Sequence, residues 1–356
     1  LISQHEFDRY KQLPDRQGPS VLLVKDAIGQ RDEVVRQAEA TAMVRDMVNT
    51  PAADMGPDKL ETIVDKLSEK HGGEVKVTRG DTLEEHFPMI HGVGKAAMRA
   101  HAPRLIELKW GKANHPKIAI VGKGVTFDTG GLSMKSPAGM LLMKKDMGGA
   151  AHALALASLV MEAKLPVHLH LLIPAVENAI DGSALRPGDI LNSRKGLTVE
   201  ITNTDAEGRL VLGDALTLAG EEEPELIIDF ATLTGAARVA LGPDLPAMFC
   251  DDPEMADGLL QAGEQESDPL WQMPLWSGYD AMLNSPIADC VNSASGSFAG
   301  CITAALFLKK FAPESVPWAH FDTFAWRPVA KPGRPIGGEA LGLRASWRFL
   351  QGRYGQ

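Results

Sequence analysis

Charged side chains gather in three short segments between residues 123 and 209, inside otherwise apolar sequence. The segments are 121–135, 144–149 and 203–210. Their candidate site residues are Lys123, Asp128, Lys135, Asp146, Asp205, Glu207 and Arg209. Two divalent ions about 4 Å apart need shared carboxylates and a nearby cationic group for the charge that develops in the reaction. Because all of these residue types occur together, the segments predict one dinuclear metal site.

The segment 203–210 is the most informative of the three. Asp205 and Glu207 are two residues apart, so on an extended segment both carboxylates would project to the same side. Gly208 then frees the backbone, and a helix is predicted to follow. A strand end with two carboxylates and Arg209 suits a metal site with an anion pocket beside it. An acidic turn that caps a helix, with Arg209 paired to one acid, explains the same residues, and this segment alone does not decide between the two.

The other acids and lysines also have structural explanations. Asp128 can form an Asx turn, and Asp146 can cap the apolar helix that follows it. Lys123 and Lys135, taken singly, are typical of solvated surface lysines. Beside two metal ions a functional role is favoured over a surface one. Cationic neighbours depress the pKa of an ammonium group and allow a lysine to serve as a neutral nitrogen ligand.

Patterns typical of other hydrolases and of nucleotide-binding proteins are missing. His152, His168 and His170 lack the His-x-x-x-His and His-Glu-x-x-His spacings, and we interpret His168 and His170 as structural. The sequence has no Walker phosphate loop and no Gly-x-Ser-x-Gly elbow. Nucleotide binding and serine-centred hydrolysis are therefore weakly supported.

Composition narrows the class of protein further. The 356 residues are 44% hydrophobic and carry a formal net charge of -10, which disfavours non-specific binding to nucleic acid. The three cysteines are Cys250, Cys290 and Cys301, and their odd number without paired spacing favours reduced thiols and a cytoplasmic location. No apolar run reaches membrane-spanning length, and no signal peptide opens the sequence, so we expect no membrane partner.

Strands and helices are predicted to alternate along most of the chain. Short apolar runs predict strands at 118–121, 167–173, 226–230 and 318–322, and helices are predicted at 32–48, 147–163 and 301–311. This order indicates the α/β class, as a three-layer α/β/α sandwich around a mostly parallel or mixed sheet. We interpret 1–37 as a shortened N-terminal region and linker, with a strand at Val21–Val24, and 38–356 as the catalytic domain.

The ordered set of motifs resembles the leucyl (cytosol) aminopeptidase family, the dinuclear metallopeptidases of the M17 type. Residues 203–210 match the signature octapeptide of that family. The run 121–135 and Asp146 with the residues after it reproduce its other ligand segments with the same internal spacing, and 231–236 and 318–322 are similar to its later motifs. The resemblance covers about residues 40 to 345.

The resemblance implies a ligand set and a reaction. Lys123, Asp128, Asp146 and Glu207 would hold one ion, and Asp128, Asp205 and Glu207 the other, the ions being Mn or Zn, with Mg or Co as alternatives. The implied enzyme releases N-terminal amino acids, Leu- or Met-like preferred, from peptides with a free N-terminus by attack of a metal-activated hydroxide. Lys135 and Arg209 would be catalytic: Lys135 stabilises the oxyanion, and Arg209 holds a bicarbonate that acts as general base. Lys123 is then expected to be neutral and Lys135 charged.

The resemblance also implies a pocket for the first side chain of the substrate. It would be formed by Met143, Thr232, Leu233, Gly235 and Ala299, with Leu233 acting through its backbone. A methionine among small residues makes an adaptable apolar pocket. Leu141-Leu142 stands where many relatives carry an acidic residue, so the rim of the pocket is expected to differ.

Partners follow from the same resemblance. Members of the family assemble as hexamers, so a homohexamer is expected. Two other functions are weighed against the aminopeptidase. DNA binding on the same scaffold conflicts with the acidic balance of the chain. Hydrolysis of phosphate esters by two metals usually uses histidine ligands, and none is evident here.

Overall fold

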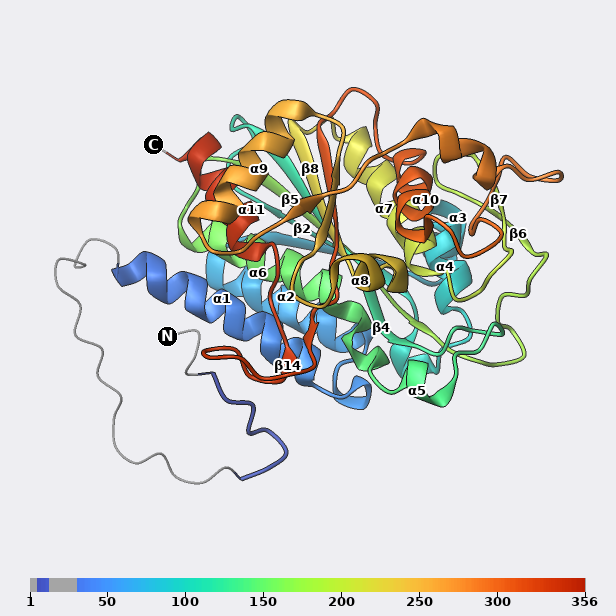
Figure 1. Cartoon of the computed structure of the whole chain (residues 1–356), viewed down its shortest axis with the longest axis horizontal. Helices are drawn as coiled ribbons and strands as arrows, with labels where there is room; N and C mark the ends of the chain where they lie inside the picture. The colour runs from blue at the N-terminus through green and yellow to red at the C-terminus, as the bar shows by residue number, and fades with distance from the viewer. Residues whose placement is uncertain (1–4, 13–30, 356) are drawn as a thin grey trace.

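The computed structural model describes residues 5–12 and 31–355, and it has three layers, with helices on both faces of a central sheet (Figure 1). The strand predicted at Val21–Val24 lies outside the described residues. The predicted three-layer α/β/α sandwich is confirmed, and its sheet is mixed rather than purely parallel. None of the described helices is long and apolar enough to cross a membrane.

The large sheet has the strand order β1-β2-β5-β3-β8-β12-β9-β10, and β4 pairs with the end of β5. Its strands are β1 (Glu74–Arg79), β2 (Arg104–Trp110), β3 (Lys117–Gly122), β4 (Gly124–Asp128), β5 (His168–Asn178), β8 (Leu226–Ala231), β9 (Ala247–Cys250), β10 (Trp271–Gln272) and β12 (Trp318–Asp322). The central strands β5, β3, β8 and β12 run parallel. Their carboxyl ends therefore meet at one edge, where open α/β sheets place their ligands.

The helices divide between the two faces of this sheet (Figure 1). One face is covered by α1 (Arg31–Asn49), α2 (Pro57–His71), α6 (Gly148–Glu162), α9 (Pro253–Gln265) and α11 (Leu343–Tyr354). The other is covered by α3 (Gly80–His86), α4 (Pro88–Gly94), α7 (Gly208–Glu221) and α10 (Gly300–Lys309). Two short helices, α5 (Pro137–Met140) and α8 (Gly235–Leu241), lie at the sheet edge that carries the charged segments.

Burial on both faces explains why the predicted strands read as continuous apolar runs. In β3, Ile118 and Ile120 pack in the core on the α6 side, whereas Ala119 and Val121 pack on the α7 side. The predicted helices and strands are confirmed within a few residues, and the strand predicted at 167–173 extends to Asn178.

Smaller elements complete the described chain. A three-stranded sheet contains β6 (Ile190–Asn192), β7 (Thr198–Glu200) and β11 (Cys290–Val291), and a two-stranded ribbon contains β13 (Trp326–Arg327) and β14 (Gly337–Gly338). Short 3-10 helices lie at Ala52–Asp54, Arg99–His101, Met143–Met147 and Ser277–Leu283.

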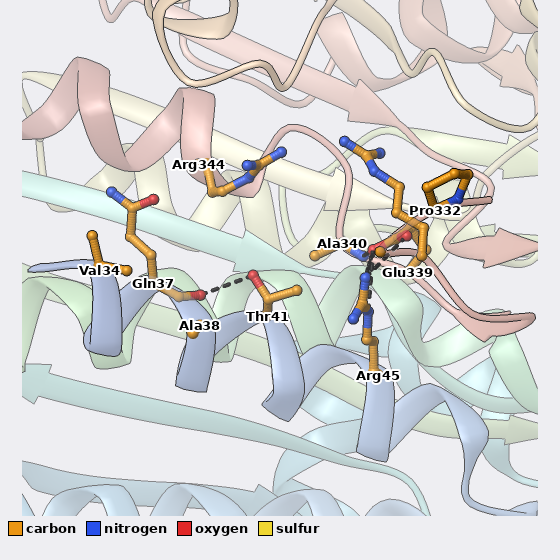
Figure 2. A pocket seen from close by; sticks show the side chains of 11 residues that line it. Val34, Gln37, Ala38, Thr41, Arg45, Pro332, Glu339, Ala340 and Arg344 are labelled. Carbon is orange, nitrogen blue, oxygen red and sulfur yellow. Dashed lines mark hydrogen bonds and ion pairs between the residues drawn. The ribbon is translucent and has the colours of Figure 1, made fainter. Parts of the chain in front are cut away.

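A buried ion-pair network ties α1 to the segment after β14. The Arg45 guanidinium contacts the Glu339 carboxylate at 3.0 Å, at the floor of a pocket between α1 and residues 332–344 (Figure 2). The other Glu339 oxygen accepts a hydrogen bond from Arg327 Nε at 3.1 Å. All three side chains are almost fully buried. Glu339 is therefore the shared anion for two guanidinium groups.

Replacing Glu339 by leucine is expected to destabilise the fold by about 3–5 kcal/mol, because two buried guanidinium groups would lose their shared carboxylate. Urea unfolding followed by circular dichroism measures this change. Glu85→Leu, at an exposed position in α3, is the matched control. A loss below about 1 kcal/mol for Glu339→Leu would show that the network does not hold α1 in place.

Candidate active site

The charged segments all reach the edge where the central parallel strands end. Lys123 follows β3, and its backbone N–H donates to the Phe230 carbonyl at the end of β8. Asp128 is the last residue of β4, which runs beside the end of β5. Asp146 lies in the 3-10 turn directly before α6, and Glu207 directly precedes α7. Sheet order therefore brings together residues that are far apart in the sequence.

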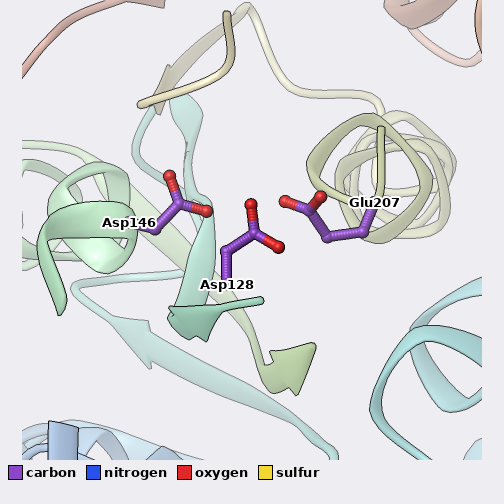
Figure 3. Close-up of side chains that lie close together, drawn as sticks. All are labelled: Asp128, Asp146 and Glu207. Carbon is purple, nitrogen blue, oxygen red and sulfur yellow. The ribbon is translucent and has the colours of Figure 1, made fainter. Parts of the chain in front are cut away.

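Three buried carboxylates converge at this edge. Oxygen atoms of Asp128, Asp146 and Glu207 lie within 4.8 Å of one another, and Figure 3 shows the three groups pointing toward one common space. Each of these residues is only 2% exposed. Buried like charges at such distances repel one another, so they require cations among them. This is the donor set that a divalent metal ion needs.

Lys123 supplies one of these cations. Its ammonium lies 2.7 Å from Asp146 Oδ2 and 3.0 Å from Glu207 Oε1, and it donates to the Thr232 carbonyl at 3.1 Å. Burial opposes the charged form of Lys123, but the carboxylates of Asp146 and Glu207 outweigh it and raise its pKa in the chain alone. The neutral form expected for Lys123 therefore depends on bound metal ions, which would neutralise those carboxylates.

The backbone of Gly208, in the third charged segment, lies close to the Lys123 side chain. A Cβ atom on Gly208 would lie 2.6 Å from Lys123 Cε, which is too close for a real side chain. Any larger residue at the start of α7 would push the lysine away from Asp146 and Glu207. Packing against the site thus favours glycine at position 208, whereas the backbone freedom predicted from sequence is not used, because Gly208 begins α7 without a positive φ.

Lys135 supplies the second cation. Its ammonium lies 2.8 Å from Asp128 Oδ2 and 2.5 Å from Asp205 Oδ1. Burial opposes the charged form of Lys135, but the carboxylates of Asp128 and Asp205 outweigh it and raise its pKa. Lys135 is less buried than Lys123 and borders the open cleft, so its charge can face a substrate.

Asp205 and Glu207 both face the site, but the extended segment expected there is wrong. Residues 203–207 form a turn between β7 and α7, and Glu207 already has helical backbone angles. The Asn203 side chain accepts a hydrogen bond from the Asp205 backbone N–H at 2.9 Å, which fixes this turn. The two carboxylates therefore converge through a turn, and Asp205 remains more exposed than Glu207.

Glu207 shows directly that the site suits a cation. Burial and the neighbouring Asp128 carboxylate raise the pKa of Glu207 to about 8. Its Oε2 atom is buried and has no hydrogen-bond partner among the described residues. A divalent ion next to this oxygen would favour the ionised form and supply the missing contact. The residues present therefore fit a bound metal ion.

Arg209 is the second residue of α7, two residues after Glu207. Its Nη1 donates to the Asn292 carbonyl at 2.8 Å, whereas its buried Nε has no hydrogen-bond partner within the described part of the chain. Burial lowers the pKa of Arg209 to about 10. A buried guanidinium with an unused donor suits a small planar anion that binds through a fork of N–H groups.

The carboxylates line one end of a cleft of about 760 Å³. Met143, Thr232, Leu233 and Gly235, all predicted for the first side-chain pocket, line it too. Ala299 is not among the described residues that line the cleft; its neighbour Gly300 takes that place. Ala299 has a left-handed backbone (φ 53°) directly before α10.

Asn178 is a site residue that sequence reasoning missed. Its side-chain amide donates to Asp128 Oδ1 at 2.8 Å and to the Thr204 carbonyl at 3.1 Å. It thereby links the first and third charged segments. The only sequence signal was a polar residue following the apolar run of β5, which is not specific.

Asp322 at the end of β12 holds the loop that follows β8. Its carboxylate accepts hydrogen bonds from the backbone N–H groups of Leu233 and Thr234, at 2.9 and 3.1 Å, and from Thr234 Oγ1 at 2.6 Å. In the same loop, Thr232 Oγ1 donates to Asp146 Oδ1 at 2.8 Å. This loop is therefore fixed both to the neighbouring strand and to a candidate metal ligand.

Fold and site together define an α/β protein with a buried carboxylate cluster suited to divalent metal ions. Residues 42–345 match the model of the cytosol aminopeptidase family, catalytic domain. The chain belongs to this family, whose members are dinuclear metallopeptidases, and it is a metal-dependent aminopeptidase. The predicted resemblance is thus confirmed.

Several relatives agree with this assignment. A probable cytosol aminopeptidase of Syntrophotalea carbinolica is 41% identical over 360 residues, which cover 97% of this chain and 72% of the relative. A probable cytosol aminopeptidase of Geobacter sp. (strain M21) is 38% identical over 369 residues, which cover 99% of this chain and 74% of the relative.

Solved structures show the same fold. The crystal structure of cytosol aminopeptidase from Coxiella burnetii superposes with a TM-score of 0.95 at 50% identity, covering 99% of this chain and 76% of that one. The bottromycin maturation enzyme BotP in complex with Mn gives a TM-score of 0.91 at 34% identity, covering 99% and 77%.

Proposed function

We propose that this aminopeptidase releases apolar N-terminal residues, Leu- or Met-like preferred, from peptides with a free N-terminus. The observation that carries the proposal is the convergence of Asp128, Asp146 and Glu207 at one end of a cleft that Met143 also lines. A methionine side chain adapts to different apolar groups, which suits a pocket of broad preference.

The two metal ions would be held by overlapping ligand sets. Lys123, Asp128, Asp146 and Glu207 would hold one, and Asp128, Asp205 and Glu207 the other. Support comes from the buried, unpartnered Oε2 of Glu207 and from the Mn reported for BotP. Mn or Zn suits these ligands best, with Mg or Co as alternatives. When bound, the ions supply an activated hydroxide and polarise the scissile carbonyl.

Two cationic side chains would act on the reacting groups. Lys135 borders the cleft with its ammonium between Asp128 and Asp205, so its charge is available to the oxyanion of the tetrahedral intermediate. Arg209 would bind a bicarbonate through its unused Nε, and that anion would take up the proton as general base. Lys123 would act as a neutral metal ligand and remain outside the proton transfers.

The remaining parts of the proposal concern the whole protein. We expect a cytoplasmic homohexamer that binds peptides and neither membranes nor nucleic acid. Residues 1–37 would form an N-terminal region and linker, and 38–356 the catalytic domain. The continuous helix α1 spans this boundary, so the linker would enter the catalytic domain without a break.

The direct test is release of free leucine from Leu-Gly by metal-stripped protein, before and after addition of Mn or Zn. We expect no release without metal and release restored by either ion, with Leu-Gly and Met-Gly cleaved faster than Ala-Gly. A folded protein that releases no amino acid with Mn, Zn, Mg or Co would contradict the proposal.

A further inference from the structure

The cleft contains two further basic side chains that make no hydrogen bond to the four site carboxylates within the described part of the chain. Arg238 and Lys145 both line it, together with Phe324. The site carboxylates are already paired, since Lys123 contacts Asp146 and Glu207, and Lys135 contacts Asp128 and Asp205. Arg238 is exposed and Lys145 is buried, and because both line the cleft, both can meet a ligand that enters it.

Arg238 lies next to the pocket expected for the first side chain. It is three residues after Gly235 in α8, so the two residues share one face of this helix. A Cβ atom placed on Gly235 would lie 4.0 Å from Arg238 Nη2. Within the described part of the chain, the guanidinium makes no ion pair with a carboxylate, so it can accept an anionic ligand.

Lys145 approaches the same pocket from the 3-10 helix Met143–Met147, two residues after Met143. It is buried, and its ammonium makes no hydrogen bond to any described residue. The nearest carboxylate oxygen is Asp146 Oδ1 at 3.6 Å, which already accepts the Thr232 hydroxyl. Burial lowers the pKa of Lys145, and its ion pair with Asp146 is long, so an anion bound beside it would favour its charged form.

Phe324 holds the two cations at the same place. Arg238 Cζ lies 5.0 Å from the centre of the ring and Lys145 Nζ lies 5.4 Å from it. Contacts with an aromatic face attract the cations but leave their charges uncompensated. Two basic groups around one ring, beside Met143 and Gly235, are suited to an anion that enters the cleft.

We propose that Arg238, Lys145 and Phe324 bind the side-chain carboxylate of an acidic N-terminal residue, so that the enzyme also releases glutamate and aspartate. This inference rests on the proposed aminopeptidase function and extends its substrate class. Phe324 would pack against the methylene groups of the substrate side chain, and the two cations would bind its carboxylate. The reaction itself is the same hydrolysis of the first peptide bond.

The test compares glutamyl and glutaminyl p-nitroanilides, which differ in charge but hardly in size, on the metal-loaded enzyme. We expect kcat/KM to favour glutamyl over glutaminyl by about tenfold or more, as is typical of hydrogen bonds to charged groups. Arg238→Met and Lys145→Met should each lower this ratio about tenfold, mainly through KM. Arg99→Met, at an exposed position elsewhere, should leave the ratio unchanged.

A wild-type ratio of one or less, or a ratio that neither cleft variant changes, would overturn the proposal. The C-terminal carboxylate of a dipeptide is the other source of the same chemistry. If Arg238→Met lowers kcat/KM for Leu-Gly but not for Leu-Gly-amide, the subsite binds the C-terminal carboxylate of the dipeptide. That result would also overturn the proposal.

Failure of the proposed function gives a different result. It appears as no turnover of leucyl, glutaminyl or glutamyl substrates. In that case, calorimetric binding of free glutamate and glutamine decides the subsite. Glutamate that binds about tenfold more tightly than glutamine, with the difference lost in Arg238→Met, supports the subsite. Equal binding of the two amino acids overturns it.

Discussion

Replacing Lys135 by methionine is expected to lower kcat for leucine release by about 10²–10³-fold, with a much smaller change in KM. The ammonium of Lys135 lies at the cleft, paired with Asp128 and Asp205, both candidate metal ligands. Its charge would stabilise an oxyanion that exists only in the transition state and the intermediate that follows. An interaction of this kind affects kcat more than substrate binding.

The pKa of Lys135 makes the prediction sharper. Burial opposes its charged form, but Asp128 and Asp205 outweigh burial and raise its pKa in the chain alone, which favours the ammonium. Lys135→Arg should then recover part of the rate, because it restores a positive charge. Lys112→Met, at an exposed position, is the matched control. Steady-state kinetics with Leu-p-nitroanilide measures all three variants, and a methionine variant within about threefold of wild type would rule out the role.

Replacing Glu207 by glutamine is expected to lower activity by more than about 10³-fold and to weaken metal binding. Glu207 would contribute to both ions. Glutamine has the same shape but no negative charge. Lys123 would keep its contacts with Asp146 at 2.7 Å and with the Thr232 carbonyl at 3.1 Å, so the fold should persist.

Metal content after dialysis, measured by mass spectrometry beside thermal unfolding, tests this prediction. We expect Glu207→Gln to retain less than the two ions of the wild type while unfolding cooperatively. Glu264→Gln, at an exposed position in α9, is the control and should retain both ions. A Glu207→Gln protein that keeps two ions and nearly full activity would remove Glu207 from the ligand set.

The sequence predicted most of the fold because burial leaves a plain pattern. Strands covered by helices on both faces, such as Lys117–Gly122 and Leu226–Ala231, read as short apolar runs between helical segments. It did not predict the antiparallel pairing of β2 with β5, because strand order depends on contacts between distant segments.

The site was predicted as far as residue type and spacing allow. Charged residues in apolar surroundings identified the side chains that converge, including Asp128, Asp146 and Glu207. The turn at 203–207 was one of two interpretations left open, because Asp205 and Glu207 would also share one side of an extended strand. Asn178 and Asp322 were missed because their importance comes from the loops beside which the sheet order places them.

The central claim is that two metal ions, held by these residues, drive release of N-terminal amino acids. The most direct measurement titrates metal-stripped protein with Mn while leucine release from Leu-Gly and bound metal are followed together. We predict binding of two ions per chain, with activity rising until the second site is filled. Full activity without bound metal, or with one ion per chain at saturation, would contradict the account.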